Sequence, residues 1–448
     1  AGSIQELGGA ARLGGVLSAE LAQPEPPVWL DSGDALEGSE VFHRFGGAAE
    51  LEVLSALGLS AMALGNHELA LDGRALAAVL ESSAGFPVLA ANLRVAERAF
   101  LYGRLARTAV LAVRGLRVGV LGVAHESAPP QIRSTHNPWQ VEVSEAAGSV
   151  QVAVDELLPS TDLIVVLSHL GLDADKALIS GTTGIDVVLG GHQHIVTREP
   201  EWVDDCSNHE LAQVRGCSPR RVPVVHSGAY GKLVSRLDLW LTGREGLTPG
   251  FEVEEARLTH FPLGADTPED ARVLGLLDAY RSAAASPPLG FVPVRLTRVS
   301  ALGGDTALGN LTADALRRAA GTDVSMVNGS ALRTDVEAGI LLPSELELSH
   351  PFADGISRVR TSGAALKRGL TRALRKAAAR GCVSTLQVSG VRLLVRCASC
   401  AGEGEGCFEA FLPGLGLGEV SLGDARLLTA ALPNYLTQAG ADFEELAA

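Results

Sequence analysis

Short apolar runs alternate with amphipathic segments along the first half of the chain. The runs end in glycine or a polar residue, as buried strands do, whereas the segments between them carry apolar residues at a helical period. We expect strands over residues 28–30, 61–64, 86–93, 113–125, 161–171, 184–194, 222–228 and 233–243. We expect helices over residues 5–22, 43–57, 73–82, 143–157 and 173–180. This alternation predicts a layered α/β sandwich whose strands are largely parallel.

Several of the predicted strands end in side chains that can bind a metal ion. They are Asp34, Asn66 with His67, His169, and His192 with His194. One histidine after a buried strand is usually a structural residue, but polar donors at four strand ends are hard to explain by chance. Ligands of open α/β sheets bind at the carboxyl ends of the strands. Because oxygen and imidazole donors without thiolates suit zinc, manganese, iron or magnesium, the sequence predicts a metal centre.

The length and charge of the chain limit the class of protein further. A chain of 448 residues is too long for one hydrophobic core and predicts at least two domains. No stretch offers about eighteen consecutive apolar residues, so we expect no membrane span. The net charge of -15 argues against a nucleic-acid polymer as partner. It also means that an anionic substrate needs metal ions or a few well-placed arginines.

The cysteines bear on where the protein resides. There are six, namely Cys206, Cys217, Cys382, Cys397, Cys400 and Cys407. An even number, in a chain that begins without methionine, fits disulfides in an exported protein, periplasmic or extracellular. The last four would alternatively form a zinc knot. We favour disulfides, because the AGEGEG stretch among them is a plain loop without a second metal motif.

A helix and a hinge are expected between the two halves of the chain. Residues 265–283 predict a helix with Thr267 as N-cap and Pro268 at its first position. The SPPLG stretch at 286–290 follows as a hinge-like joint. A substrate held by one domain and cut by the other would require movement about this joint.

Four motifs of the first half, taken in order, resemble those of the calcineurin-like metallophosphoesterases. They are GD at 33–34, GNHE at 65–68, SH at 168–169 and GGHQH at 190–194. Four motifs of the second half narrow the resemblance to the 5'-nucleotidase family. They are LGNLTADALRRA at 308–319, VNGSALR at 327–333, HPFAD at 350–354 and LPNYLTQAGADF at 432–443.

The resemblance implies a fold and an activity. Residues 1–262 would form a four-layer-type α/β sandwich, residues 263–290 a linker helix and hinge, and residues 291–448 a smaller α+β domain that binds substrate. The implied reaction is release of phosphate from nucleotides by water that two divalent ions activate. The ions would be zinc, manganese, magnesium or cobalt, and the partner a small phosphoester.

The metal-binding roles that the resemblance implies fall on motif residues. Asp34 would bridge the two ions. Asn66, His169 and His192 would complete the shell of one ion, and His194 would bind the other. Four further histidines are expected to be structural or to lie at the rim, and of these His226 has the best claim to line the cleft. They are His125, His136, His226 and His350.

By the same resemblance, His67 would stabilise the charge that grows on the phosphoryl and departing oxygens. This role needs a cation, so a carboxylate should lie behind the imidazole. Ala70 stands where the family has that aspartate. Asp72, two residues on, would replace it as a catalytic residue if the turn is longer.

Substrate binding would fall on the second domain. Phe352 and Tyr435 would sandwich a nucleobase, since flat aromatic faces stack on any base. Asn328 and Arg333 would bind base and phosphate, and a guanidinium fork suits phosphate well. In a chain that is only 4% aromatic, two rings at the expected loop positions favour this role over ordinary core packing.

The sequence departs from the family pattern in three more places. Residues 1–7 lack the Asp-x-His of the first strand, and the missing initiator favours a chain trimmed by one strand. Leu302 replaces an expected arginine, and Ala441, beside Asp442, replaces the aspartate that holds the ribose. These departures leave two alternatives. One is a related dinuclear hydrolase of cyclic nucleotides, nucleotide sugars or sulfur compounds, and the other is a non-catalytic descendant that binds a ligand.

Overall fold

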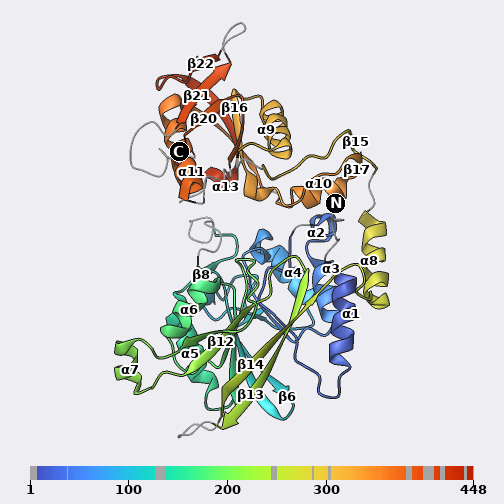
Figure 1. The fold of residues 1–448 in the computed structure, drawn as a ribbon, viewed down its shortest axis with the longest axis vertical. Coiled ribbons are helices and arrows are strands. Elements are labelled where there is room, and N and C mark those ends of the chain that lie inside the picture. The colour runs from blue at the N-terminus through green and yellow to red at the C-terminus, as the bar shows by residue number, and fades with distance from the viewer. Residues whose placement is uncertain are drawn as a thin grey trace. The chain divides into compact units, whose positions relative to one another are not determined.

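The computed structural model describes residues 8–37, 39–126, 137–243, 250–284, 287–300, 304–352, 354–379, 386–396, 408–413, 419–437 and 441–446. The chain divides into two compact units (Figure 1). The first contains Ala1–Glu37 and Val41–Ala285, and the second contains Gly38–Glu40 and Ser286–Ala448. Helix α8 (Ala271–Ala284) therefore belongs to the first unit, whereas the linker and hinge expected over 263–290 stay a prediction.

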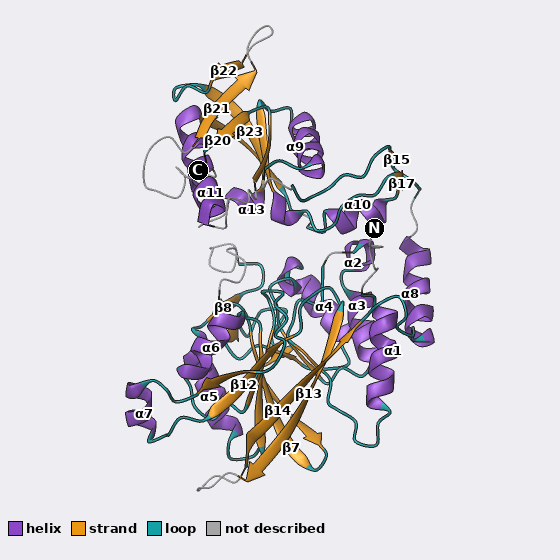
Figure 2. Cartoon of the chain, in the orientation of Figure 1, coloured by secondary structure: helices purple, strands orange, loops and turns teal. Residues whose placement is uncertain are grey.

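A four-stranded sheet and a six-stranded sheet form the centre of the first unit (Figure 2). One contains parallel strands in the order β1-β2-β3-β5, which are Leu30–Asp31, Ala61–Ala63, Val88–Leu89 and Leu105–Ala106. The other has the order β11-β12-β10-β9-β7-β6, which are Glu201–Asp204, Arg221–His226, Val187–Gly190, Leu163–Ser168, Leu116–Val123 and Thr108–Val113. Its inner strands are parallel and its two edge strands are antiparallel.

Alternating side chains on the strands bind the layers together. On β9, Leu163 and Val165 pack with residues of β2 and β3, whereas Ile164 and Val166 pack with two helices. Those helices are α5 (Ala146–Leu157) and α6 (Leu172–Ser180). On the far face of the other sheet lie α3 (Ala48–Ala56) and α4 (Gly73–Ser83). The order helices, sheet, sheet, helices confirms the four-layer α/β sandwich (Figure 1).

Other elements of the first unit complete this frame. Helix α1 (Ala10–Leu21) packs on α8, and a long hairpin is formed by β13 (Leu233–Gly243) and β14 (Phe251–Pro262). Strands β4 (Leu93–Val95) and β8 (Val141–Val143) pair antiparallel.

Two helices differ from the expected ones because of glycine residues and helix caps. The expected helix 43–57 is two helices, α2 (Glu40–Phe45) and α3, because Gly46 and Gly47 both adopt positive φ, 59° and 90°. The expectation that Thr267 caps α8 is wrong. Asp270 accepts hydrogen bonds from the backbone N–H groups of Arg272 (2.8 Å) and Val273 (3.3 Å) instead.

The second unit is a smaller α+β domain, as expected. Its main sheet has the order β18-β23-β16-β19, which are Ile356–Ser362, Leu427–Pro433, Val324–Asn328 and Leu386–Ser389. Its longer helices are α9 (Ala307–Ala320) and α11 (Gly363–Ala379). Smaller elements are β15 (Gly290–Val292), β17 (Gly339–Leu341), α10 (Pro343–Ser349), β20 (Arg392–Val395), β21 (Phe408–Pro413), β22 (Glu419–Ser421) and α13 (Asn434–Thr437).

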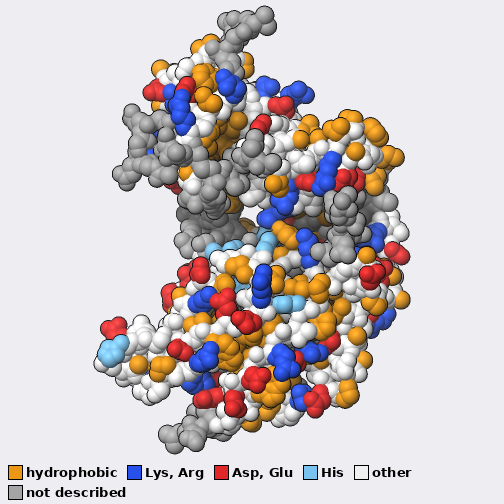
Figure 3. Space-filling view, in the orientation of Figure 1, with side chains coloured by type: hydrophobic (Ala, Val, Ile, Leu, Met, Phe, Trp, Pro, Cys, Tyr) orange, Lys and Arg blue, Asp and Glu red, His pale blue; other side chains and the backbone are white. Residues whose placement is uncertain are grey.

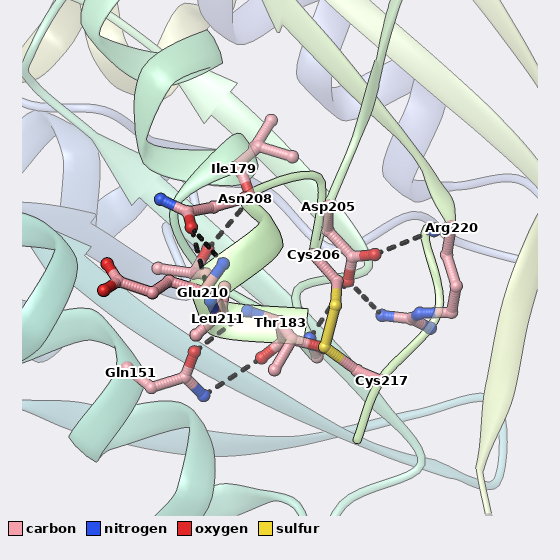
Figure 4. Close-up of a disulfide and its surroundings, with 12 residues drawn as sticks. Gln151, Ile179, Thr183, Asp205, Cys206, Asn208, Glu210, Leu211, Cys217 and Arg220 are labelled. Atoms are coloured by element: carbon pink, nitrogen blue, oxygen red, sulfur yellow. Dashed lines mark hydrogen bonds and ion pairs between the residues drawn. A yellow bond between two sulfur atoms is a disulfide. The ribbon is translucent and has the colours of Figure 1, made fainter. Parts of the chain in front are cut away.

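One disulfide joins Cys206 to Cys217 and closes the segment that carries α7 (His209–Arg215), between β11 and β12 (Figure 4). Disulfide bonding is thus confirmed for this pair, and the other four cysteines lie outside the described residues. Beside the bridge, the buried carboxylate of Asp205 pairs with Arg220 at 3.1 Å. Among the described helices, none has the length and apolar composition needed to cross a membrane.

Candidate metal centre

Strand ends from both large sheets converge at one place in the first unit. Asp34 follows β1, Asn66 follows β2, His169 follows β9, and His192 follows β10. Donor atoms of Asp34, His169 and His192 all lie within 4.8 Å of one another. The side chain of Asn66 accepts a hydrogen bond from Nδ1 of His192 at 3.0 Å. In the described ranges, these three carboxylate and imidazole groups are the one set close enough to share a cation.

The loop that presents Asp34 is held by a buried carboxylate. Glu68 is fully buried and accepts hydrogen bonds of 2.6–3.1 Å from four backbone N–H groups, those of Gly65, Asp34, Ala35 and Leu36. Burial, and then the nearby Asp34 carboxylate, raise the pKa of Glu68. Sequence reasoning gave Glu68 no role, although its place directly after Asn66 and His67 was a usable signal.

His169 has the geometry of a ligand. Its Nδ1 donates a 2.6 Å hydrogen bond to the carbonyl oxygen of Ser32, which leaves Nε2 as the lone-pair nitrogen of the neutral ring. That Nε2 is buried without a hydrogen-bond partner among the described residues, yet it lies 2.8 Å from Oδ2 of Asp34. Two electron-rich atoms at that distance need a proton or a cation between them. Burial by itself lowers the pKa of His169, but the Asp34 carboxylate outweighs burial and raises it, so positive charge is favoured here.

His192 is favoured in its neutral form, whose lone pair can bind a metal ion. Burial, assisted by the neighbouring His125 and His169, lowers its pKa to about 4. Its ring centroid lies 4.1 Å from that of His125 and 5.1 Å from that of His169. His125, expected to be structural or at the rim, therefore lies against the centre. With Nδ1 donating to Asn66, Nε2 of His192 is free to offer its lone pair to a cation.

His67 lies beside these ligands and is oriented by two carboxylates. Its backbone N–H donates to Oδ1 of Asp34 at 2.8 Å, and its Nε2 lies 3.7 Å from Oδ2 of Asp34. Its Nδ1 is hydrogen bonded to Glu37, in the loop that follows Asp34. Burial alone lowers the pKa of His67, but Glu37 and Asp34 outweigh burial and raise it. The imidazole is thereby favoured in its cationic form, as its expected role requires.

The contact with Glu37 corrects the expectation for Asp72. After His67 the chain makes only a short 3-10 turn, Glu68–Ala70, before α4 begins at Gly73. Asp72 is therefore turned toward the helix, where it accepts hydrogen bonds from the N–H groups of Arg74 (2.9 Å) and Ala75 (2.8 Å). It is an N-cap, and Glu37 supplies the carboxylate. The only signal in the sequence was the place of Glu37, three residues after Asp34.

His194 lies outside the group of three. It is exposed, and its ring stands edge-on to Tyr230 with centroids 5.0 Å apart. Its assignment to a second ion stays a prediction. His226 is only 1% exposed, which agrees with a structural role and gives no support to its lining the cleft. His136 and Leu302 lie outside the described residues.

The residues expected to bind substrate lie in the second unit. Asn328 ends β16, and its side-chain oxygen is buried without a hydrogen-bond partner among the described residues. The guanidinium of Arg333 lies over the ring of Phe352, 4.9 Å from its centroid. Tyr435, on α13, is 54% exposed. Asp442, adjacent to Ala441, is engaged by Lys376 at 2.8 Å.

Comparisons with known proteins agree with this architecture. Residues 286–404 match the family described as 5'-nucleotidase, C-terminal domain. A 5'-nucleotidase of Diplobatis ommata is 30% identical over 240 residues, which are 52% of this chain and 41% of that protein. The 5'-nucleotidase of Bos taurus is 27% identical over 414 residues, covering 87% of this chain and 70% of that protein. The chain thus spans about two fifths of the first of these relatives.

Solved structures show the same two-part fold. The 5'-nucleotidase precursor of Thermus thermophilus superposes with a TM-score of 0.81 at 25% identity, over 99% of this chain and 86% of that one. A sulfate thiohydrolase, SoxB, of the same species superposes with a TM-score of 0.72 at 19% identity, over 97% and 77%. The second likeness concerns the fold alone.

Proposed function

Because the chain belongs to the 5'-nucleotidase family, we propose that it is a metal-dependent phosphoester hydrolase that releases phosphate from nucleotides. The observation that carries this proposal is the convergence of Asp34, His169 and His192 within 4.8 Å, with His67 beside Asp34. A buried imidazole nitrogen 2.8 Å from a carboxylate oxygen, as at His169, is a place where a cation fits.

The donor set decides which cations fit. Carboxylate, amide and imidazole donors suit zinc, manganese, magnesium or cobalt. Asp34, Asn66, His169 and His192 would hold one ion, and Asp34 with His194 would hold a second. Ions held there would supply neutralisation of phosphate charge and would lower the pKa of a water molecule.

The protein's own groups orient the substrate and move protons. Glu37 holds Nδ1 of His67, and we assign to its Nε2–H the role of donor to a phosphoryl oxygen or to the departing oxygen. Asn328, Arg333, Phe352 and Tyr435 would bind the base and phosphate. The buried side-chain oxygen of Asn328, which has no hydrogen-bond partner among the described residues, is suited to a donor on the base. We further propose that the protein is exported, since the Cys206–Cys217 disulfide persists in oxidising compartments.

The proposal is tested by phosphate release from the protein after its metal has been stripped with EDTA and one cation restored. We expect release from nucleoside 5'-monophosphates with manganese, zinc or cobalt, and background release without metal. Asp34→Asn should abolish it, because the carboxylate shared by the ligands is lost. His209→Asn, on exposed α7, is the matched control and should leave the rate unchanged.

Other outcomes would replace the proposal. Release only from cyclic nucleotides, nucleotide sugars or sulfur esters would make the protein a related hydrolase. Metal binding without turnover of any of them would make it a ligand-binding descendant. Equal turnover by the parent and by Asp34→Asn would remove the centre from the reaction.

A further inference from the structure

A second buried polar cluster lies beneath the metal centre and takes no part in the chemistry described so far. It consists of Ser168, Asp175 and His226, whose exposed fractions are 0%, 0% and 1%. The hydroxyl of Ser168 donates a hydrogen bond to Oδ1 of Asp175, and Nε2 of His226 donates to Oδ2 at 2.8 Å. Burying a carboxylate and an imidazole costs free energy. A fully hydrogen-bonded cluster of this kind therefore points to a role in fixing the backbone segments that it joins.

The cluster ties together the strand ends that carry two of the ligands. Ser168 is the last residue of β9, directly before His169, and His226 is the last residue of β12. Between these strands lies β10, and its last residue, Gly190, pairs with both Ser168 and His226. Asp175, on α6, therefore bridges the two outer strands across the end of the middle one.

The middle strand is shaped to let this bridge pass. A Cβ atom on Gly190 would overlap the polar atoms of both His226 and Asp175, so only glycine fits there. The chain then continues through Gly191, whose N–H donates to the carbonyl oxygen of Ser168 at 2.8 Å, to His192. On the other side, the Ser168 hydroxyl accepts a hydrogen bond from the N–H of Leu170 at 3.2 Å, which fixes the turn around His169.

We propose that Asp175, with Ser168 and His226, is a positioning residue that fixes the relative placement of the ligands His169 and His192 and so sets metal affinity. It touches neither ligand side chain and acts through the backbone on either side of them. The inference rests on the proposed metal centre but not on nucleotide hydrolysis, so the two can fail separately. Removal of groups that orient metal ligands typically weakens metal binding by about 10- to 100-fold.

The decisive variant is Asp175→Asn, which keeps the shape of the side chain. The carboxylate accepts from two donors, whereas an amide has one acceptor oxygen and turns its NH2 group toward the other donor. Calorimetric titration of Mn²⁺ into the metal-free protein should show a Kd about 10- to 100-fold weaker than that of the parent. The matched control is Asp205→Asn, an equally buried carboxylate that pairs with Arg220 and touches no ligand strand end.

The control separates positioning from simple stability. Both variants should lower Tm, but Asp205→Asn should bind Mn²⁺ with the parental Kd. If Asp175→Asn also binds with the parental Kd, the cluster is only structural and the proposal is overturned. If metal affinity falls as expected while no nucleotide is hydrolysed even by the parent, the proposed function fails and this inference stands.

A second pair of variants keeps the proposal testable if Asp175→Asn does not fold. His226→Gln retains an N–H that can donate to Asp175 and should bind Mn²⁺ nearly as the parent does. His226→Leu has a similar volume without a donor and should reproduce the weaker binding. Equal affinities in these two variants would overturn the proposed role of the cluster.

Discussion

Residues of the centre adopt backbone conformations that side chains with a Cβ atom rarely tolerate. Asp34, Glu37, His192 and His194 have φ angles of 64°, 76°, 70° and 59°. Such positions cost roughly 1–3 kcal/mol each and persist only where surrounding contacts impose them. At Asp34 those contacts are visible, because the buried Glu68 carboxylate holds the N–H groups of the loop. The shape of the loop thus depends on a fully buried residue.

His67 is the residue whose loss should affect the reaction without affecting the metal. It lies beside Asp34 but outside the group of three ligands. We expect His67→Asn to lower kcat by about 10²–10³-fold with metal content unchanged, because a donor to the developing charge is lost. Phosphate release and metal analysis measure the two quantities. An unchanged kcat would remove His67 from the mechanism, and a loss of metal would make it a ligand.

Glu37 should set the pH range over which His67 is a cation. Burial lowers the pKa of His67, and Glu37 is the first of the groups that outweigh burial and raise it. Glu37→Gln removes that charge, so the pKa falls and the imidazolium is lost at a lower pH. We expect the alkaline limb of the kcat–pH profile to move to lower pH.

Asp72→Asn is the matched control for this shift. Asparagine caps a helix about as well as aspartate does, so α4 should be retained and the limb should stay at its parental pH. A shift in Asp72→Asn with none in Glu37→Gln would restore the role first expected of Asp72.

At the scale of elements, the ends of strands and helices decide the placement of functional groups. Strands β9 and β10 are parallel neighbours with Gly190 in register with Ser168, so His169 and His192 emerge at the same edge of the sheet. Strands β1 and β2 bring Asp34 and Asn66 to that edge from the other sheet. The helices support this frame from outside, and their caps contribute to its stability.

The cap of α8 gives a prediction for an element far from the chemistry. Asp270 accepts hydrogen bonds from two N–H groups at the helix start, and it also accepts one from the hydroxyl of Ser18 on α1 at 2.8 Å. We expect Asp270→Ala to lower the free energy of unfolding by about 1–2 kcal/mol, measured by urea unfolding. Thr267→Ala, at the cap expected from the sequence, should cost less. The reverse order would return the cap to Thr267.

At the scale of the whole molecule, the proposed function requires an acidic protein to bind an anion. Basic and acidic side chains are interspersed over the face shown in Figure 3, so the excess negative charge is not gathered into one region of that face. Attraction to phosphate must therefore come from local groups, namely bound cations and residues such as Arg333. We therefore propose that the base is recognised by uncharged surfaces of the second unit.

The aromatic residues of the second unit should affect nucleotides selectively. Stacking of a base on an aromatic ring contributes about 1–3 kcal/mol, so Phe352→Ala and Tyr435→Ala should each raise KM for a nucleotide by about 5- to 150-fold. The KM for ribose 5-phosphate, which has no aromatic ring to stack, should not change. Phe291→Ala, an exposed ring of the same unit, is the control. Equal effects on both substrates would mean that the rings only support the fold.

The sequence by itself determined the layers and the principal donors. Apolar runs that stop at a glycine or polar residue are a local signal, and a parallel sheet brings such ends to one edge, so Asp34, Asn66, His169 and His192 could be anticipated together. The predicted helix cap at Thr267 was wrong, because several residues near a helix start compete for the same N–H groups.

Only the tertiary structure decided which carboxylates support those donors. Glu37 reaches His67 across 30 residues, and Asp175 reaches His226 across 51. Asp72 is closer in sequence to His67, but its side chain caps the start of α4 instead. The packing of separate elements determines which side chains form these pairs. The hydrophobic periodicity along the chain does not predict them.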